Sequence, residues 1–228
     1  MIGAVAAMLT LAGTVLDIAL TMLPGWGPET VPASAAAWLA QLSAEPWLGL
    51  RNLDLLNALL ALIGMPMYVA LFGANRHGES ALSLLALLVT GIGAAVFVSS
   101  NVALPMLELA RTAAGASGAS SLTFEAAARA LLARGAHGSL GALPGFLISE
   151  IGTLLFAIAL VRSRVLGRAA GTLALVGTSL LALYTVAITI SPGESALVMA
   201  IAMPGGLLMM AWYVMVARGL LRLDDPAA

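Results

Sequence analysis

Long apolar stretches alternate with short polar connections along this chain. Six such stretches stand out, at Ile2–Leu23, Trp47–Phe72, Ala81–Leu104, Gly141–Val161, Gly171–Ile190 and Ala196–Val216. Each is long enough to cross a hydrocarbon core about 30 Å thick as an α-helix. None shows the period-two alternation of a membrane-spanning strand. The pattern therefore predicts an all-α fold: a polytopic transmembrane bundle of six helices, forming a single domain over residues 1–228.

The connection at about residues 111–140 predicts a short amphipathic helix of its own. After the linker RTAAGASGASS, Thr123 is placed to cap a helix, Glu125 pairs with Arg129 at i,i+4, and Gly135 ends it. The helix is expected to lie on the membrane surface through one apolar face, made of Phe124, Ala128, Leu131 and Leu132.

A second interfacial helix is expected in the first long connection. Ala33–Leu42 is rich in alanine and leucine, and Trp38 is a residue type that favours the boundary between lipid and water. The sequence thus predicts one or two short interfacial helices beside the six spans.

Composition supports lipid as the solvent of this chain. Of its 228 residues, 61% are hydrophobic and 9% are charged, with mean hydropathy +1.03. Soluble domains carry about 25% charged residues. The bias toward Ala, Gly and Arg is typical of a GC-rich bacterial genome, so we expect a bacterial plasma membrane protein, with the lipid bilayer as its first partner. The N-terminal stretch is expected to be the first span and not a cleaved signal.

Several chemistries are excluded by missing residue types. The chain has no cysteine, which removes disulfides and thiolate nucleophiles. All ten basic residues are arginine, so a lysine Schiff base is impossible. A net charge of −1 offers no basic surface to nucleic acid.

Arginine placement predicts the orientation. The turns after the second and fourth spans and the C-terminal tail hold Arg76, Arg162, Arg164, Arg168, Arg218 and Arg222. The positive-inside rule then places both termini in the cytoplasm. One connection disagrees, because the segment expected outside holds Arg111, Arg129 and Arg134.

Ionisable and amide side chains inside the spans form the main functional signal. Such groups are costly in lipid and usually face the bundle interior or a wet cavity. In the predicted topology all of them fall in the outer half of the membrane. We therefore predict an outward-facing polar pocket that binds a ligand, built from Asp17, Arg51, Asp54, Asn57, Asn101 and Glu150.

An alternative interpretation of the same residues is structural. Arg51 would neutralise Asp54, Asp17 or Glu150, and the pairs would only fix helix register. The fourth span also carries a stripe of small residues that predicts close helix packing, at Gly145, Ser149, Thr153 and Ala157.

Catalytic, metal and cofactor sites find no support in the sequence. His77 and His137 fall at opposite membrane edges, which argues against a bis-histidine haem. His137 with Glu150 lacks the short ligand spacing of a metal site, so His137 is interpreted as an exposed loop residue. There is no G-x-S-x-G elbow, no P-loop and no dinucleotide fingerprint. We predict no catalytic residue, no metal and no cofactor.

The fourth and fifth spans carry a resemblance to a known family. The text GFLISEIGTLLFAIALVRSRVLGRAAGTLALVGTSLLALY has a glycine-initiated span, an Arg-x-Arg turn and a Gly/Ala-rich returning span. It resembles a bacterial family of integral membrane proteins known only as a domain of unknown function, and RNLDLLNALLALIGMPMYVALFGANR is compatible with it. The resemblance covers about residues 50–221 and implies the membrane fold, with no activity or catalytic residues.

Three function hypotheses follow from these observations. The first is a non-enzymatic binding or transport module for a small molecule, ion or lipid. The second is a membrane-embedded enzyme acting on a lipid or small molecule. The third is a structural or regulatory membrane subunit, and homo-oligomerisation stays open.

Overall fold

The computed structural model describes residues 1–191 and 195–223, with side chains described outside 195–197. These residues form helices and no strand. Six of the described helices are long and apolar enough to span a membrane. They are α1 (Ile2–Thr21), α4 (Leu55–Asn75), α5 (Ser80–Ser100), α8 (Leu143–Ser163), α9 (Arg168–Ile190) and α10 (Ser195–Leu223). The predicted six-span, all-helical fold is therefore confirmed.

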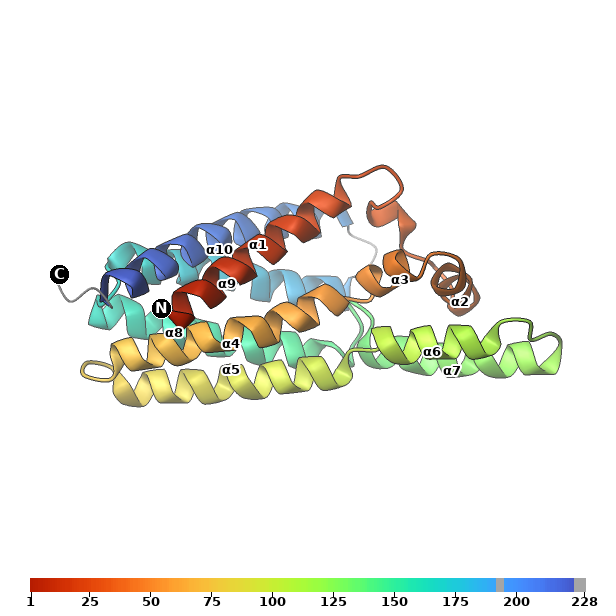
Figure 1. Ribbon diagram of the computed structural model, residues 1–228, viewed down its shortest axis with the longest axis horizontal. Helices are drawn as coiled ribbons and strands as arrows, with labels where there is room; N and C mark the ends of the chain where they lie inside the picture. The colour runs from red at the N-terminus through yellow and green to blue at the C-terminus, as the bar shows by residue number, and fades with distance from the viewer. Residues whose placement is uncertain (192–194, 224–228) are drawn as a thin grey trace.

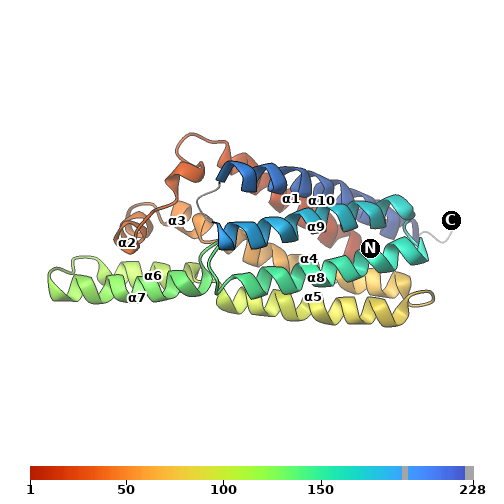
Figure 2. The same ribbon diagram turned by 180° about the vertical axis from the view of Figure 1, so that it is seen from behind.

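The six long helices pack side by side in a closed ring. Contacts run from α1 to α4, α5, α8, α9 and α10 in that order, and α10 returns to α1. Figures 1 and 2 show α1 beginning at the end of the bundle where α10 finishes. We call this the terminal end. The opposite end carries the shorter helices α2, α3, α6 and α7, and we call it the hairpin end.

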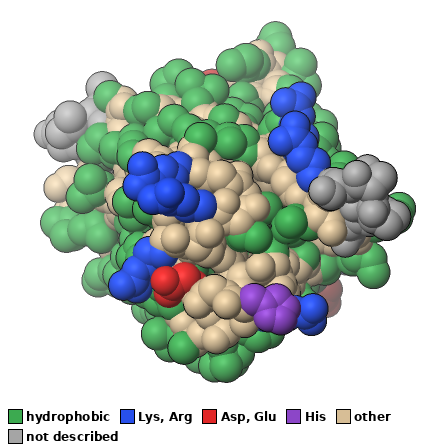
Figure 3. Space-filling view, turned by 90° about the vertical axis from the view of Figure 1, so that its left-hand side faces the viewer, with side chains coloured by type: hydrophobic (Ala, Val, Ile, Leu, Met, Phe, Trp, Pro, Cys, Tyr) green, Lys and Arg blue, Asp and Glu red, His purple; other side chains and the backbone are tan. Residues whose placement is uncertain are grey.

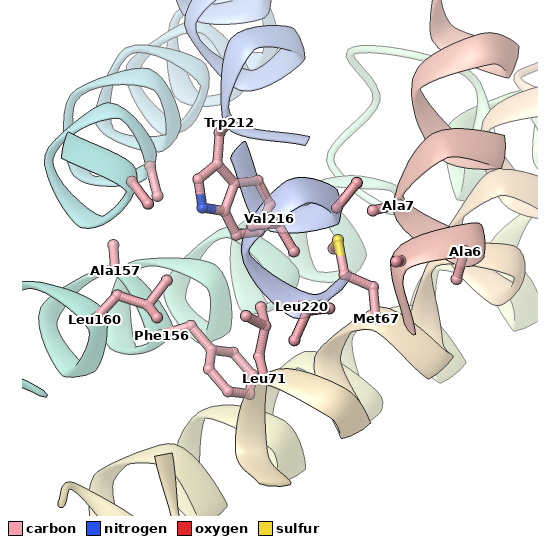
Figure 4. Packing of buried hydrophobic residues seen from close by; sticks show 14 of the residues in the cluster. Ala6, Ala7, Met67, Leu71, Phe156, Ala157, Leu160, Trp212, Val216 and Leu220 are labelled. Carbon is pink, nitrogen blue, oxygen red and sulfur yellow. The ribbon is translucent and has the colours of Figure 1, made fainter. Parts of the chain in front are cut away.

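The hydrophobic core of the bundle lies toward the terminal end. Figure 4 shows Trp212 and Val216 of α10 facing Phe156 of α8 and Leu71 of α4, and all four are fully buried. Alanines of α1, α8 and α9 complete this terminal core, including Ala7, Ala157 and Ala174. Burying large side chains stabilises the bundle here, while small ones bring the helices close.

Helices α5 and α8 approach most closely where the small-residue stripe was predicted. A Cβ added at Gly145 would lie 2.7 Å from the Phe97 Cα, and one at Gly152 would lie 2.5 Å from the Thr90 backbone nitrogen. These distances leave no room for a side chain. The predicted role of the fourth-span stripe is confirmed, with Gly152 as an additional member.

The shorter helices form an outer layer with a second core. It consists of α2 (Ala35–Ala44), α3 (Pro46–Asn52), α6 (Ala103–Ala113) and α7 (Ala119–Gly135), with α6 and α7 as an antiparallel hairpin extending past the bundle (Figure 1). Trp38 of α2 is 6% exposed in this core, so it is a packing residue and not an interface anchor.

The apolar face of α7 also packs on protein. Ala128 is fully buried, and Phe124, Leu131 and Leu132 pack against the same core, which α2 and α6 complete. We expected this face to rest on the membrane surface; its partners are instead the neighbouring helices.

Details of the α7 prediction are partly corrected. The Glu125–Arg129 pair is present at 3.5 Å, and the helix ends at Gly135 as predicted. Thr123 as the N-cap is wrong, because the helix begins at Ala119 and the Thr123 hydroxyl donates to the Ala119 carbonyl.

Two predicted spans are interrupted at the hairpin end. The second, predicted from Trp47, is divided at Leu53–Asp54 into α3 and α4. The third, predicted to Leu104, is broken after Ser100, and α6 starts at Ala103. Both interruptions bring polar side chains to the same end of the bundle.

Arginine gathers at the terminal end, as Figure 3 shows. The arginines in or beside the α4–α5 and α8–α9 turns and at the end of α10 belong to this end. Arg162, in the last turn of α8, lies 3.7 Å from Glu79 in the α4–α5 turn. These arginines lie at one end of the bundle, as the sequence predicted. Which end faces the cytoplasm stays a prediction.

Candidate ligand-binding site

A break between α3 and α4 positions the first site residue, Asp54. It has a φ of 59°, in the left-handed region that a non-glycine residue adopts at a cost. In that conformation its carboxylate accepts a hydrogen bond from Asn57 Nδ2 at 2.9 Å through Oδ1. Its other oxygen, Oδ2, lies 2.8 Å from His137 Nδ1.

His137 connects α4 to α9. It lies in the short segment between α7 and α8, and its Nε2 is 2.7 Å from the Tyr184 hydroxyl. The ring of Phe146 meets it edge to face, with centroids 5.5 Å apart. A hydrogen-bonded row thus runs from Asn57 through Asp54 and His137 to Tyr184.

The electrostatics of Asp54 and His137 describe an ion pair. Burial alone would raise the pKa of Asp54, but the charge and hydrogen bond of His137, the Asn57 hydrogen bond and the Arg51 charge together outweigh it, and the pKa lies below its ordinary value. The Asp54 carboxylate in turn raises the pKa of His137. A protonated His137 donates from both ring nitrogens, so the Tyr184 oxygen accepts and its own O–H is free to donate elsewhere.

A second charge pair joins α1 to α3. Arg51 Nε lies 3.5 Å from Asp17 Oδ1, and the guanidinium also donates to the Thr21 hydroxyl and to the Trp26 carbonyl, the latter at 2.8 Å. Of the three acids considered from the sequence, Asp17 is the one that Arg51 pairs with.

Glu150 of α8 has a different environment. Its Oε1 accepts a hydrogen bond from the Thr185 hydroxyl at 2.7 Å. Its Oε2 is buried and has no hydrogen-bond partner in the described part of the chain. No ion pair within the described residues involves Glu150.

Asn101 forms hydrogen bonds with backbone groups at the α5–α6 break. Its Nδ2 donates to the Leu53 carbonyl at 2.9 Å, and its Oδ1 accepts from the Ala103 amide at 3.1 Å. This side chain therefore ties one helix interruption to the other, and it holds the segment that leads into Asp54.

A pocket opens beside the His137–Tyr184 contact, between α8 and α9. Its free volume is about 10 Å³, which is room for about one water molecule. The side chains that line it include His137, Phe146, Tyr184, Thr185 and Thr189. Thr185 links this pocket to Glu150, since its hydroxyl donates to that carboxylate.

The hairpin-end half of the ring is acidic and lies outside the terminal core. No residue of α1 from Leu11 to Thr21 is buried, whereas Ala4, Ala6 and Ala7 of the same helix belong to the terminal core. Three carboxylates (Asp17, Asp54 and Glu150) lie here with two cationic partners, Arg51 and His137. The site is therefore a polar region above a hydrophobic floor.

The sequence prediction omitted two residues of this site. His137 was interpreted as an exposed loop residue, and it does lie exposed in the segment between α7 and α8, with its side chain 33% exposed. What the sequence did not show is that both its ring nitrogens are bonded. Tyr184 was not singled out. Its hydroxyl inside the fifth span was the available signal, but its partner lies 47 residues away in the sequence.

Within the described residues, no group of three or more His, Cys, Asp or Glu side chains is arranged to hold a metal ion. Comparison with known proteins gives no match: no protein-family model, no curated protein and no solved structure corresponds to this chain. The likeness of the fourth and fifth spans to a family of unknown function stays a resemblance.

Proposed function

We propose that this integral membrane protein is a binding or transport module for a small polar molecule, with its site at the hairpin end of the bundle. The observation that carries the proposal is the Asp54–His137–Tyr184 row, which ends at a pocket between α8 and α9. Polar residues concentrated above an apolar floor are typical of a solute site in a membrane protein.

The site is proposed to open outward from a bacterial plasma membrane. The arginines of the turns and of the α10 end lie at the terminal end, which the positive-inside rule assigns to the cytoplasm. Both termini would then be cytoplasmic, and the hairpin end would face the periplasm.

An enzymatic role has one observation in its favour. A carboxylate, an imidazole and a hydroxyl lie in a row, at 2.8 and 2.7 Å. In its neutral form, without the proton of the ion pair, His137 would accept the Tyr184 proton as a general base that Asp54 orients. Tyr184 would be the reacting group on a lipid or small molecule. Turnover of a lipid extract in detergent, abolished in Tyr184→Phe, would favour this alternative over binding.

Native mass spectrometry of the protein released gently from its own membrane tests the binding proposal. We expect a stoichiometric small-molecule adduct on the wild type, reduced at least tenfold in Tyr184→Phe and in His137→Gln. Matched controls are Tyr213→Phe, in the terminal core, and His77→Gln, in the α4–α5 turn.

Both controls are expected to keep the adduct. A wild type that carries no adduct, with all variants folded, would contradict the proposal and favour the structural interpretation of the charge pairs.

A further inference from the structure

Glu150 is the carboxylate of the site that no cation of the described chain faces. Arg51 and His137, the two cationic side chains of the site, lie against other carboxylates at 3.5 and 2.8 Å. The Thr185 hydroxyl donates to Glu150 Oε1, while Oε2 is buried and has no donor among the described residues. A buried carboxylate without a cation is stabilised by taking up a proton, which removes its charge.

Few other titratable groups lie on the helices packed against α8, and α5 has none. The groups on or beside these helices are Tyr68 of α4, Arg162 of α8, Arg168 and Tyr184 of α9, and the Asp54–His137 pair beyond Tyr184. Both arginines lie at the terminal end, and the Tyr68 hydroxyl shares a hydrogen bond with Thr153. Tyr184 is therefore the titratable group that connects this part of α9 to an acid, His137.

A row of hydrogen-bond donors leads from His137 toward Glu150. Protonated His137 donates from Nε2 to the Tyr184 oxygen at 2.7 Å, so the Tyr184 hydrogen is free to donate onward. At the other end of the row, the Thr185 hydroxyl donates to Glu150 Oε1 at 2.7 Å, so its oxygen is free to accept. One donor and one acceptor thus remain between the two ends of the row.

The small pocket between α8 and α9 joins these two hydroxyl groups. Tyr184 and Thr185 both line it, and it has room for about one water molecule. A water in such a site needs about two to four polar partners. It would accept from Tyr184 and donate to Thr185, so that every hydrogen bond in the row is directed from His137 to Glu150.

Beyond the solute binding proposed above, we propose that Glu150 is a proton-binding site, which His137 supplies through the hydroxyl groups of Tyr184 and Thr185. The Nε2 proton passes to Tyr184, the Tyr184 proton to the water, a water proton to Thr185, and the Thr185 proton to Glu150 Oε1. Each hydroxyl group and the water give up one proton and receive one, so only His137 and Glu150 change charge.

Solvent then returns a proton to His137, whose side chain is 33% exposed. Rows of carboxyl and imidazole groups inside membrane proteins carry protons in pumps and transporters. A proton held at Glu150 would give a solute transporter its coupling ion.

Infrared spectroscopy of the purified protein in nanodiscs tests whether Glu150 binds a proton. We expect a carboxylic acid band that changes with pH in the wild type and that Glu150→Gln removes. Glu79→Gln, in the α4–α5 turn at the terminal end, is the matched control and should keep the band. If Glu150→Gln does not fold, Glu150→Asp keeps the carboxyl group and identifies the band by shifting it.

The relay is tested by the rate at which this band shifts after transfer to heavy water. Thr185→Val and Tyr184→Phe remove the two hydroxyl groups of the row, and each should slow the exchange at least tenfold. Thr178→Val and Tyr213→Phe remove hydroxyl groups that lie beside the terminal core, and both should exchange as the wild type does.

The inference is overturned if Glu150→Gln removes no carboxylic acid band at any pH at which the protein stays folded, or if the Glu150 band does not change with pH. It is also overturned if Thr185→Val or Tyr184→Phe exchanges as fast as the wild type. None of these outcomes depends on a solute, so native mass spectrometry judges the binding function separately.

Discussion

His137 Nδ1 lies 2.8 Å from Asp54 Oδ2, although 83 residues separate the two in the chain. The contact ties the segment that follows the α6–α7 hairpin to the start of α4. Tyr184 on α9 extends the same row at 2.7 Å. One imidazole thus connects the outer layer to two helices of the bundle, and it does so at the mouth of the candidate pocket.

The stability of the protein should depend on pH through this ion pair. Asp54 raises the pKa of His137 above its ordinary 6.5, so the pair contributes fully below that value and is lost as the pH rises through the raised pKa. His137 lowers the pKa of Asp54 below 3.8, so on the acid side the ion pair is lost only when the pH falls below that value. We expect the unfolding temperature, followed by tryptophan fluorescence, to fall on the alkaline side.

The difference between wild type and His137→Asn measures that contribution. It should be largest between about pH 4 and 6.5 and should shrink as the pH rises. His77→Asn is the control at the opposite end of the bundle. A pH profile of His137→Asn that parallels the wild type throughout would contradict the ion pair.

Close packing of α5 on α8 should make Gly152 sensitive to the smallest substitution. In Gly152→Ala the new Cβ would meet the Thr90 backbone, which cannot move without displacing α5. Overpacking of this kind costs about 1–3 kcal/mol. Gly73→Ala in α4, where nothing lies within 4 Å, should be neutral or stabilising by about 0.5–1 kcal/mol. Equal unfolding temperatures for both variants would refute the packing account.

The Arg51–Asp17 pair should show energetic coupling. Both side chains are partly buried, and Arg51 also holds the Trp26 carbonyl, so Arg51→Ala removes more than Asp17→Ala does. A double-mutant cycle should give a coupling energy of about 0.5–2 kcal/mol. Additive effects of the two substitutions would show that the observed contact contributes no stability.

Orientation can be measured directly because the chain has no cysteine. Ser117→Cys at the tip of the α6–α7 hairpin should react with a membrane-impermeant maleimide on intact cells. Gly78→Cys, in the α4–α5 turn, should react only after permeabilisation. The opposite pattern would reverse the topology and place the candidate site toward the cytoplasm.

Much of this architecture follows from hydropathy, because each span needs about 20 apolar residues whatever its neighbours are. The same pattern could not show that the helices are interrupted at Asp54 and Asn101, since both lie within stretches predicted as single spans. Their effect depends on contacts between segments: Asn101 bonds the Leu53 carbonyl from 48 residues away.

The site was predictable only in part, for a related reason. Asp17, Arg51, Asp54 and Glu150 are conspicuous as charges in apolar surroundings. His137 lies in a polar connection, where a histidine is unremarkable, and its importance comes from the fold that brings Asp54 and Tyr184 to it. The sequence could not show that α2, α6 and α7 pack on one another, because an amphipathic face looks the same whether protein or lipid covers it. Their place at the membrane surface stays a prediction.

The central claim is that the hairpin-end half holds a polar, acidic site that solvent reaches, next to the dry hydrophobic core at the terminal end. Two cysteines on the same helix test it: Thr189→Cys in the pocket lining, and Ala174→Cys in the terminal core. The account predicts that a cationic methanethiosulfonate added from the hairpin side modifies position 189 several-fold faster than an anionic one, and that position 174 reacts from neither side. A position 189 that is unreactive, or that shows no preference for the cationic reagent, would contradict it.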